Sequence, residues 1–141
     1  MADLQESAQL NELYRLYGIA AHNCSNIEYR IVYLLLGPKW KQTANLNSEI
    51  VVEIYDKLQR LPLGVLLKEY KQHFIFSDKQ RELMDSVLEK RNYLMHRFFG
   101  AYGKKMHDPR VQEQMISELK DLTSIFQSVS RSLDPETWKQ A

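Results

Sequence analysis

Three residues that lie close together in the sequence, Arg91, Asn92 and His96, have the types needed to cleave RNA without a metal ion. The imidazole of His96 can accept the 2′-hydroxyl proton or protonate the leaving 5′-oxygen near neutral pH. The guanidinium of Arg91 can bind phosphate oxygens and stabilise the negative charge that develops at phosphorus. Because the 2′-hydroxyl would attack, the substrate would be RNA, the products would carry a 2′,3′-cyclic phosphate and a 5′-hydroxyl, and DNA would be inert.

Helical geometry separates the arginine from the histidine. On a straight helix Arg91 and His96 would lie roughly 140° apart, whereas Asn92 and His96 would differ by about 40°. Asn92 could therefore orient His96 or the phosphate. Arg91 would have to reach around the helix or act across a subunit boundary, and a composite site in a homodimer would meet that demand.

A histidine that follows an arginine after four to six residues is common by chance. This chain should contain roughly 0.7 such matches, and Arg15 with His22 is a second one, which we assign to an ordinary helix surface. An asparagine directly after the arginine, at the four-residue spacing, lowers the expectation to about 0.01. The alternative interpretation makes His96 an ordinary surface or packing histidine.

The segment from Arg91 to His96, late in an expected long helix, resembles the signature of the HEPN superfamily. The resemblance implies a helical bundle that dimerises so that the arginine and histidine of both subunits line one cleft, with Arg91, Asn92 and His96 as catalytic residues. It further implies a metal-independent endoribonuclease without a cofactor, acting as a toxin or antiviral defence effector. Some HEPN proteins have lost catalysis, so a catalytically silent module that binds nucleotides, RNA or proteins is the alternative.

One departure from the family bears on regulation. A toxin branch carries a tyrosine two residues after the histidine, where its antitoxin adenylylates it, and this chain has Phe98 there. Control by modification at that position is therefore excluded, although Tyr93 and Tyr102 are nearby. An antitoxin or another regulatory protein remains an expected partner.

Basic residues are concentrated around the segment, although the net charge of the chain is only +1. Residues 61–110 hold ten Lys or Arg against six Asp or Glu. Binding to RNA phosphates requires a basic surface of this local kind. We therefore expect four side chains to guide RNA, with plain solubility as the other interpretation: Lys90, Arg97, Lys104 and Lys105.

Two further features could touch the site. Glu28 lies in an otherwise apolar stretch and could approach the cleft, although a salt bridge to Arg30 or to a neighbouring helix is the better interpretation. The aromatic residues at positions 93, 98, 99 and 102 could stack on bases, although packing in the core or in a dimer is the better interpretation.

Helices are expected throughout, because glycine and proline are scarce and apolar residues recur at three- and four-residue spacing. The pattern predicts a first helical region over about residues 3–36, which Gly18 could split or bend and which Gly37-Pro38 ends, with a loop through Trp40 and Thr43. A second helix should begin at Asn47 or Ser48 and run to a break at residues 61–64. A short helix over about residues 65–72 and an apolar connector over 74–76 should follow.

The helix that carries the candidate site should begin at a capping box made by Ser77 and Gln80 and continue to Phe99, with glycines 100 and 103 supplying the stop. Asp108 and Pro109 should begin a final helix, which residues 134–135 close. Four main helices and a short one predict an all-α fold, an antiparallel up-and-down bundle, in one domain of 141 residues.

Several protein classes are excluded. The single cysteine, Cys24, allows neither an internal disulfide framework nor a thiolate zinc cluster and fits a reducing compartment. There is no phosphate-binding glycine loop, no serine elbow and no Glu-x-x-His pair for a di-iron centre, so we expect no metal. The acidic N-terminus lacks a signal core, and the longest apolar run, residues 31–36, is too short for a bilayer. A cytoplasmic protein without a membrane span is expected.

Overall fold

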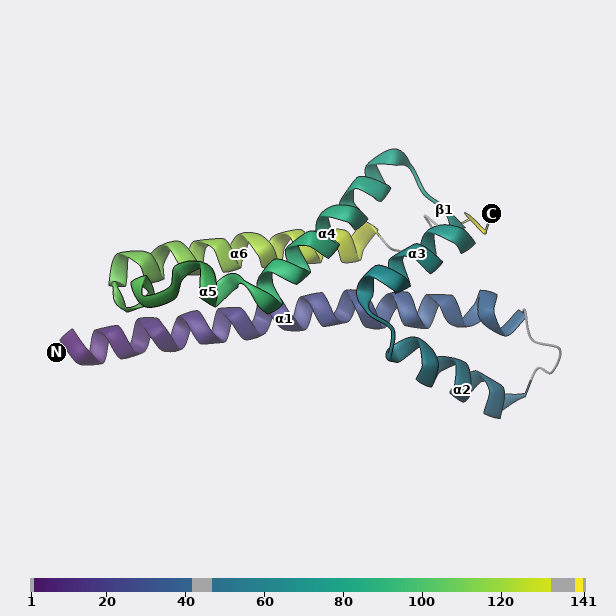
Figure 1. The fold of residues 1–141 in the computed structure, drawn as a ribbon, viewed down its shortest axis with the longest axis horizontal. Helices are drawn as coiled ribbons and strands as arrows, with labels where there is room; N and C mark the ends of the chain where they lie inside the picture. Colours follow the sequence, from purple (N-terminus) through teal and green to yellow (C-terminus); the bar gives the residue numbers. More distant parts are fainter. Residues whose placement is uncertain (1, 42–46, 133–138, 141) are drawn as a thin grey trace.

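The computed structural model describes residues 2–41, 47–132 and 139–140 of the chain (Figure 1). These residues form six α-helices, one 3-10 helix and one pair of two-residue strands. The all-α class is confirmed. In chain order the elements are α1 (Ala2–Lys41), α2 (Ser48–Gln59), α3 (Leu63–His73), β1 (Phe74–Ile75), α4 (Asp78–His96), α5 (Phe98–Tyr102), η1 (Gly103–His107), α6 (Pro109–Ser132) and β2 (Lys139–Gln140).

Helix α1 is longer than its sequence pattern predicts. Gly18 does not divide it, and the helix passes Gly37 and Pro38 and includes Trp40. Pro38 lies within the last turn, where a missing backbone N–H removes one hydrogen bond close to the helix end, and its ring is buried. The prediction that Gly37-Pro38 ends the helix was therefore wrong, while Thr43 lies outside the described residues.

Three predicted helix starts are confirmed by side-chain caps. The side chain of Asn47 accepts a hydrogen bond of 2.9 Å from the backbone of α2. Ser77 and Gln80 form the reciprocal capping box of α4, with hydrogen bonds of 3.2 and 2.9 Å. Asp108 accepts a hydrogen bond of 2.9 Å from the first turn of α6. The short helix begins earlier than predicted, at Leu63, directly after the Pro62 of the predicted break.

The connector predicted after α3 forms part of a small sheet. β1 pairs with β2 in antiparallel fashion, with Phe74 opposite Gln140 and Ile75 opposite Lys139. Residues 134–135, predicted to close α6, lie outside the described residues.

The long helix predicted to run to Phe99 is divided in the structure. α4 ends at His96, and Arg97 leaves the helical conformation with φ −130° and ψ −13° before α5 begins. α5 then ends at Gly103, whose φ of 53° favours glycine, so the stop predicted there is confirmed, whereas Gly100 lies within α5 and stops no helix. His96 is therefore the last residue of its helix.

The two longest helices, α1 and α6, lie side by side and run in the same direction (Figure 1). The side-chain amide of Gln9 donates a hydrogen bond of 3.3 Å to the carbonyl of Pro109, which ties their N-terminal parts together. α4 runs back across them in the opposite sense, while α2 and α3 lie at the other end of α1. This order departs from four alternating helices because the short α3 makes a full chain reversal of its own.

The buried side chains form one continuous cluster. α4 packs against both long helices, and the hydroxyl of Tyr17 on α1 donates a hydrogen bond of 3.1 Å to the carbonyl of Leu94. These contacts fix the rotation of α4 and thus the direction of the candidate site residues. No helix in the described part of the chain has the length and apolar character needed to cross a bilayer.

Candidate functional site

The rotation of α4 separates the three candidate catalytic residues. Asn92 and His96 are exposed, whereas Arg91 is half-buried. Arg91 falls on the same side of the helix as the buried stripe, because it lies three and four residues from members of that stripe. The stripe consists of Met84, Val87 and Leu94.

The guanidinium of Arg91 joins α4 to α1. Its Nε donates a hydrogen bond of 3.2 Å to Oε1 of Glu28, and its Nη1 donates one of 3.2 Å to Oδ1 of Asn92. The side chains of the Arg91–Glu28 ion pair are 27% and 31% exposed, so water screens the pair only in part. The expectation that Glu28 pairs with a neighbouring helix is confirmed.

The single cysteine lies beside this ion pair. Burial, and after it the negative charge of Glu28, raise the pKa of the Cys24 thiol to about 12, although the positive charge of Arg91 opposes the rise. Cys24 is completely buried. The thiol therefore stays protonated at neutral pH and is no candidate nucleophile.

His96 lies at the rim of a shallow hollow of about 420 Å³ at the junction of α4 and α5. Tyr93, Arg97, Gly100 and Ala101 form the rest of its lining. Because His96 is exposed and ends its helix, its imidazole can reach a ligand in this hollow. Arg91 is not part of the lining.

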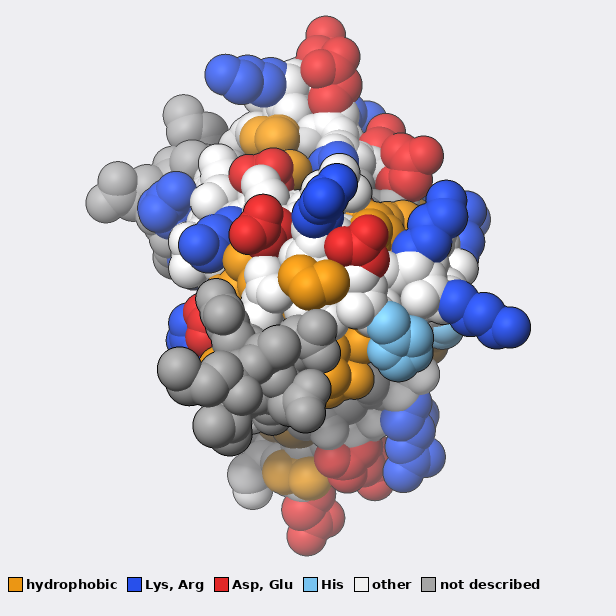
Figure 2. Space-filling view, turned by 90° about the vertical axis from the view of Figure 1, so that its left-hand side faces the viewer, with side chains coloured by type: hydrophobic (Ala, Val, Ile, Leu, Met, Phe, Trp, Pro, Cys, Tyr) orange, Lys and Arg blue, Asp and Glu red, His pale blue; other side chains and the backbone are white. Residues whose placement is uncertain are grey.

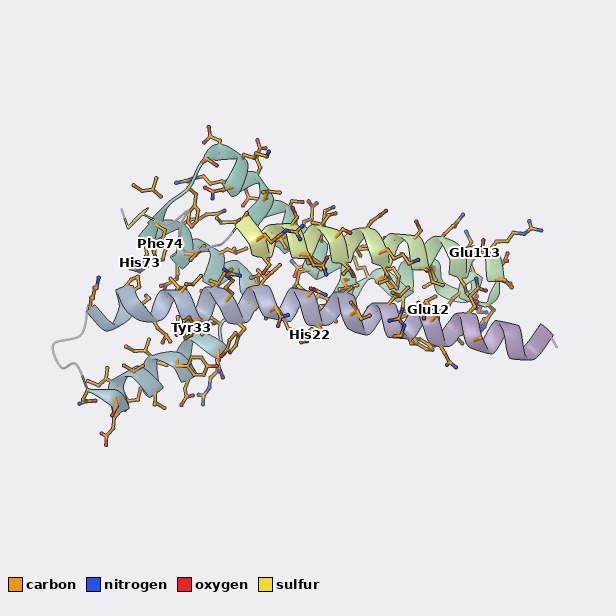
Figure 3. All side chains as sticks on the ribbon, turned by 180° about the vertical axis from the view of Figure 1, so that it is seen from behind. Glu12, His22, Tyr33, His73, Phe74 and Glu113 are labelled. Carbon is orange, nitrogen blue, oxygen red and sulfur yellow. The ribbon has the colours of Figure 1, made fainter. Side chains whose placement is uncertain are left out.

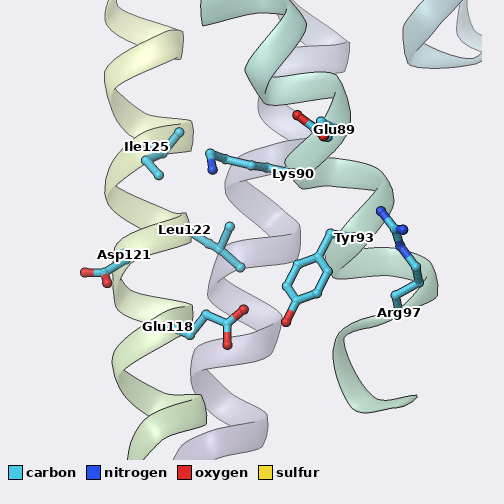
Figure 4. Close-up of a pocket in the computed structure, with 8 residues that line it drawn as sticks. All are labelled: Glu89, Lys90, Tyr93, Arg97, Glu118, Asp121, Leu122 and Ile125. Carbon is cyan, nitrogen blue, oxygen red and sulfur yellow. The ribbon is translucent and has the colours of Figure 1, made fainter. Parts of the chain in front are cut away.

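A larger hollow of about 570 Å³ lies between α4 and α6 (Figure 4). Lys90 and Tyr93 line it from α4, and Arg97 lines it from the position directly after that helix; Tyr93 and Arg97 also belong to the His96 hollow. Lys90 and Arg97, two of the expected RNA-guiding residues, thus lie together. Three carboxylates, those of Glu89, Glu118 and Asp121, line the same hollow, so its charge is mixed.

Glu118 on α6 holds two tyrosines. The hydroxyl of Tyr102 donates a hydrogen bond to Oε2 of Glu118, and the hydroxyl of Tyr93 points toward the same carboxylate in Figure 4. Burial, together with the hydrogen bond to Glu118, raises the pKa of Tyr93 to about 12. Burial and Glu118 likewise raise the pKa of Tyr102. Both phenols remain protonated donors at neutral pH.

The aromatic cluster around these tyrosines packs in the interior. Phe98 is 1% exposed, and its ring lies 6.1 Å from that of Tyr93 and 5.6 Å from that of Tyr102, centroid to centroid. Phe99 contacts Tyr17 of α1 at 4.8 Å. The packing interpretation of this cluster is confirmed.

Lys104 and Lys105, the other two expected RNA-guiding residues, are exposed in η1 and line neither hollow. Figure 2 looks onto the end of the molecule where α5 and η1 lie. There, lysine and arginine side chains are interspersed with acidic ones. The four expected basic residues therefore fall into two separate pairs.

Sequence reasoning missed Glu118, which no motif distinguishes from the other acidic residues of α6. Its partner Tyr102 lies 16 residues away in the sequence, and only the packing of α5 on α6 brings the two together. Among the described residues, no three His, Cys, Asp or Glu side chains are placed to hold a metal ion.

Comparisons with models of known protein families, with curated proteins and with solved structures gave no significant match. The evidence for the candidate site therefore comes from the residues and the geometry of this chain alone.

Proposed function

We propose that the chain is a metal-independent endoribonuclease of the HEPN type, which leaves a 2′,3′-cyclic phosphate and a 5′-hydroxyl. In this proposal His96 is the general acid or base, Arg91 binds the phosphate and stabilises the transition state, and Asn92 positions both. The observation that carries the proposal is the Arg-Asn-x-x-x-His segment at the end of a packed helix. Its histidine, His96, is exposed, and its arginine, Arg91, donates a hydrogen bond to Glu28 on α1.

The environment of Arg91 supports a functional role. A half-buried guanidinium on the side of an apolar stripe loses hydration, a cost that its hydrogen bonds to Glu28 and Asn92 must offset. An aliphatic side chain would pack at this position without needing a partner. The two hydrogen bonds described occupy Nε and Nη1, so a phosphate would be bound through Nη2 or would displace Asn92.

A two-fold partner belongs to the proposal. Arg91 faces α1 while His96 faces solvent, so the arginine of one subunit would act with the histidine of the other in a HEPN-like dimer. Lys90 and Arg97 would contact the RNA near the His96 hollow, and Lys104 and Lys105 would contact it farther along. As a toxin or antiviral effector in the cytoplasm, the enzyme would be controlled by an antitoxin or another regulatory protein.

Incubation of the purified protein with transfer RNA in EDTA tests the activity directly. We expect cleavage that leaves cyclic phosphate ends and that falls at least about 100-fold in His96→Ala and Arg91→Ala. His22→Ala is the matched control, because exposed His22 belongs to the second arginine–histidine match and should retain full activity. Intact RNA with the wild type, or cleavage that persists in both variants, would overturn the proposal.

A catalytically silent binding module is the second candidate function. It is favoured by the engagement of Arg91 with Glu28 and Asn92, which is also what a purely structural ion pair would show. In that case the same RNA would bind, with affinity reduced in Lys90→Ala and Arg97→Ala, but would remain intact. A filter-binding measurement beside the cleavage assay separates the two functions.

A further inference from the structure

The two hollows beside α4 share part of their lining. Tyr93 and Arg97 line both the His96 hollow and the larger hollow between α4 and α6, which we call the α4–α6 hollow. A ligand bound at His96 can therefore extend past these two side chains into the α4–α6 hollow. The volume of that hollow, about 570 Å³, lies within the range of small-ligand sites, about 300–1,000 Å³.

The α4–α6 hollow contains charges of both signs that do not pair with one another. Its two cations and three carboxylates belong to Lys90, Arg97, Glu89, Glu118 and Asp121. Among the described residues, no ion pair joins any of these five side chains to another group. The cations can only donate hydrogen bonds and the carboxylates accept them. A ligand that matches the hollow must therefore carry donors on one edge and acceptors on another.

Glu118 is the acceptor whose position in the hollow is fixed. The hydroxyl of Tyr102 donates a hydrogen bond to its Oε2, and the hydroxyl of Tyr93 points toward the same carboxylate (Figure 4). A carboxylate can accept about four hydrogen bonds, so the two phenols leave roughly two places for a ligand. Because the tyrosines already orient the carboxylate, ligand binding loses little entropy in ordering it.

We propose that the α4–α6 hollow binds the guanine base of the nucleotide next to the cleaved phosphate, and that Glu118 selects this base. Guanine carries two adjacent donors, N1–H and the 2-amino group, which match the two oxygens of one carboxylate. Its O6 and N7 are acceptors, which lysine and arginine side chains bind. The assignment to the cleaved nucleotide rests on the proposed function.

The other three bases lack this division into a donor edge and an acceptor edge. Adenine and cytosine have a ring nitrogen that accepts hydrogen bonds directly beside the amino group, so a carboxylate that binds the amino group would face a second acceptor. Uracil has a carbonyl oxygen on each side of its N3–H. A buried or half-buried acceptor left opposite another acceptor weakens binding, and Glu118 should therefore discriminate against all three bases.

The remaining groups of the hollow suit guanine as well. In Figure 4 Lys90 reaches across the hollow toward Ile125, so its Nζ can donate to O6 or N7 of a base whose donor edge faces Glu118. Leu122 and Ile125 provide an apolar wall for the face of the ring. Arg97 lines both hollows and can therefore bind the phosphate that joins the base to the His96 hollow.

Binding of guanosine 3′-monophosphate, measured by calorimetry, tests base selection without cleavage. We expect the wild type to bind it at least about tenfold more tightly than the adenosine, cytidine and uridine 3′-monophosphates. In Glu118→Gln the amide can accept from the 6-amino group of adenine and donate to its N1, so the preference should turn toward adenine. Equal affinity of the wild type for all four nucleotides would overturn the proposal.

Glu113→Gln is the matched control for the loss of charge on α6. Glu113 is exposed near the start of α6 and lines neither hollow, so this variant should keep the preference for guanine (Figure 3). Circular dichroism checks that both variants are folded. If Glu118 only held Tyr93 and Tyr102 in place, Glu118→Gln would weaken binding of all four nucleotides by the same factor, which would contradict base selection.

A change in the ligand gives a measurement that needs no substitution in the protein. Inosine 3′-monophosphate lacks the 2-amino group of guanine and is otherwise the same molecule. We expect the wild type to bind it about tenfold more weakly than guanosine 3′-monophosphate, because one hydrogen bond to a charged oxygen is lost. Equal affinity for the two nucleotides would show that no carboxylate contacts the amino group.

Cleavage of transfer RNA distinguishes failure of base selection from failure of the proposed function. Binding that is selective for guanine, together with intact RNA, would refute the nuclease and support the guanine site. Cleavage with no preferred base beside the new ends would refute the guanine site and support the nuclease. Both are supported if the new ends lie beside guanine in the wild type and in Glu113→Gln, and beside adenine in Glu118→Gln.

Discussion

The outer faces of α1 and α6 differ although the two helices lie parallel and bury their inner faces in the same core. Of the eleven exposed residues of α6, five are charged and none is aromatic, whereas the eight exposed residues of α1 between Tyr14 and Tyr33 include one charged residue and three tyrosines. Charged side chains on an exposed helix face favour solubility, so α6 has the ordinary composition. The fold evidently tolerates either composition, because the shared core depends on the inner faces of the two helices.

The largest losses of stability are expected from substitutions on the inner faces, where α1 and α6 should respond alike. Phe126 on α6 and Ile27 on α1 are both fully buried. We expect Phe126→Ala to lower the free energy of unfolding by about 3–5 kcal/mol and Ile27→Ala by about 2–5 kcal/mol. Urea denaturation measures both. A loss below about 1 kcal/mol for Ile27→Ala would mean that α1 is not part of the core.

The ion pair between α1 and α4 should contribute less than the core. Glu28→Gln leaves the half-buried guanidinium of Arg91 without a counter-charge, and we expect a loss of about 1–2 kcal/mol in the free energy of unfolding. A double-mutant cycle with Arg91→Gln measures the coupling, with about 1 kcal/mol expected. Coupling near zero would show that Glu28 does not hold Arg91 in solution. Arg15→Gln is the control, because its exposed pair with Glu12 should contribute little.

The starts of the helices could be predicted from the sequence because their signals are local. The side chains of Asn47, Ser77 and Asp108 each cap a backbone group within a few residues, so their spacing in the sequence is their spacing in space. The periodicity of apolar residues predicted the helices for the same reason. Where a local signal competed with packing, as at Pro38, the sequence prediction failed.

The partners within the candidate site could not be predicted in the same way. Glu28 and Arg91 are 63 residues apart, and their contact depends on how α4 is rotated against α1. The sequence indicated only that Glu28 would pair with some neighbouring helix. The angular separation of Arg91 and His96 followed from helix geometry, whereas no local signal in the sequence marked the end of α4 at His96, two residues before the buried Phe98.

A side chain caps the start of α6, and its removal should have a smaller effect on stability than the loss of a core residue. Asp108 caps α6 and lies outside the core, so Asp108→Ala should lower the free energy of unfolding by about 1 kcal/mol. Asp121→Ala, at an exposed position within α6, should change it by less than about 0.5 kcal/mol. Thermal denaturation of both variants checks the difference. Equal effects would show that the cap contributes nothing beyond the loss of a surface charge.

The smallest expected effect on stability comes from the ionisation of Cys24, on the inner face of α1, and it should appear only at alkaline pH. Burial raises the pKa of Cys24 to about 12, whereas an unfolded thiol ionises near about 8.5. The unfolded state therefore loses its proton first, so the contribution of the thiol is fully present below about pH 8.5 and declines as the pH rises toward 12. The stability advantage of the wild type over Cys24→Ala should accordingly be constant near neutral pH and shrink above pH 9. Tyrosines and lysines titrate in both proteins, so their effects cancel in the comparison. If the difference in free energy of unfolding between the two proteins stayed constant up to pH 11, the thiol would ionise as readily in the folded state as in the unfolded state.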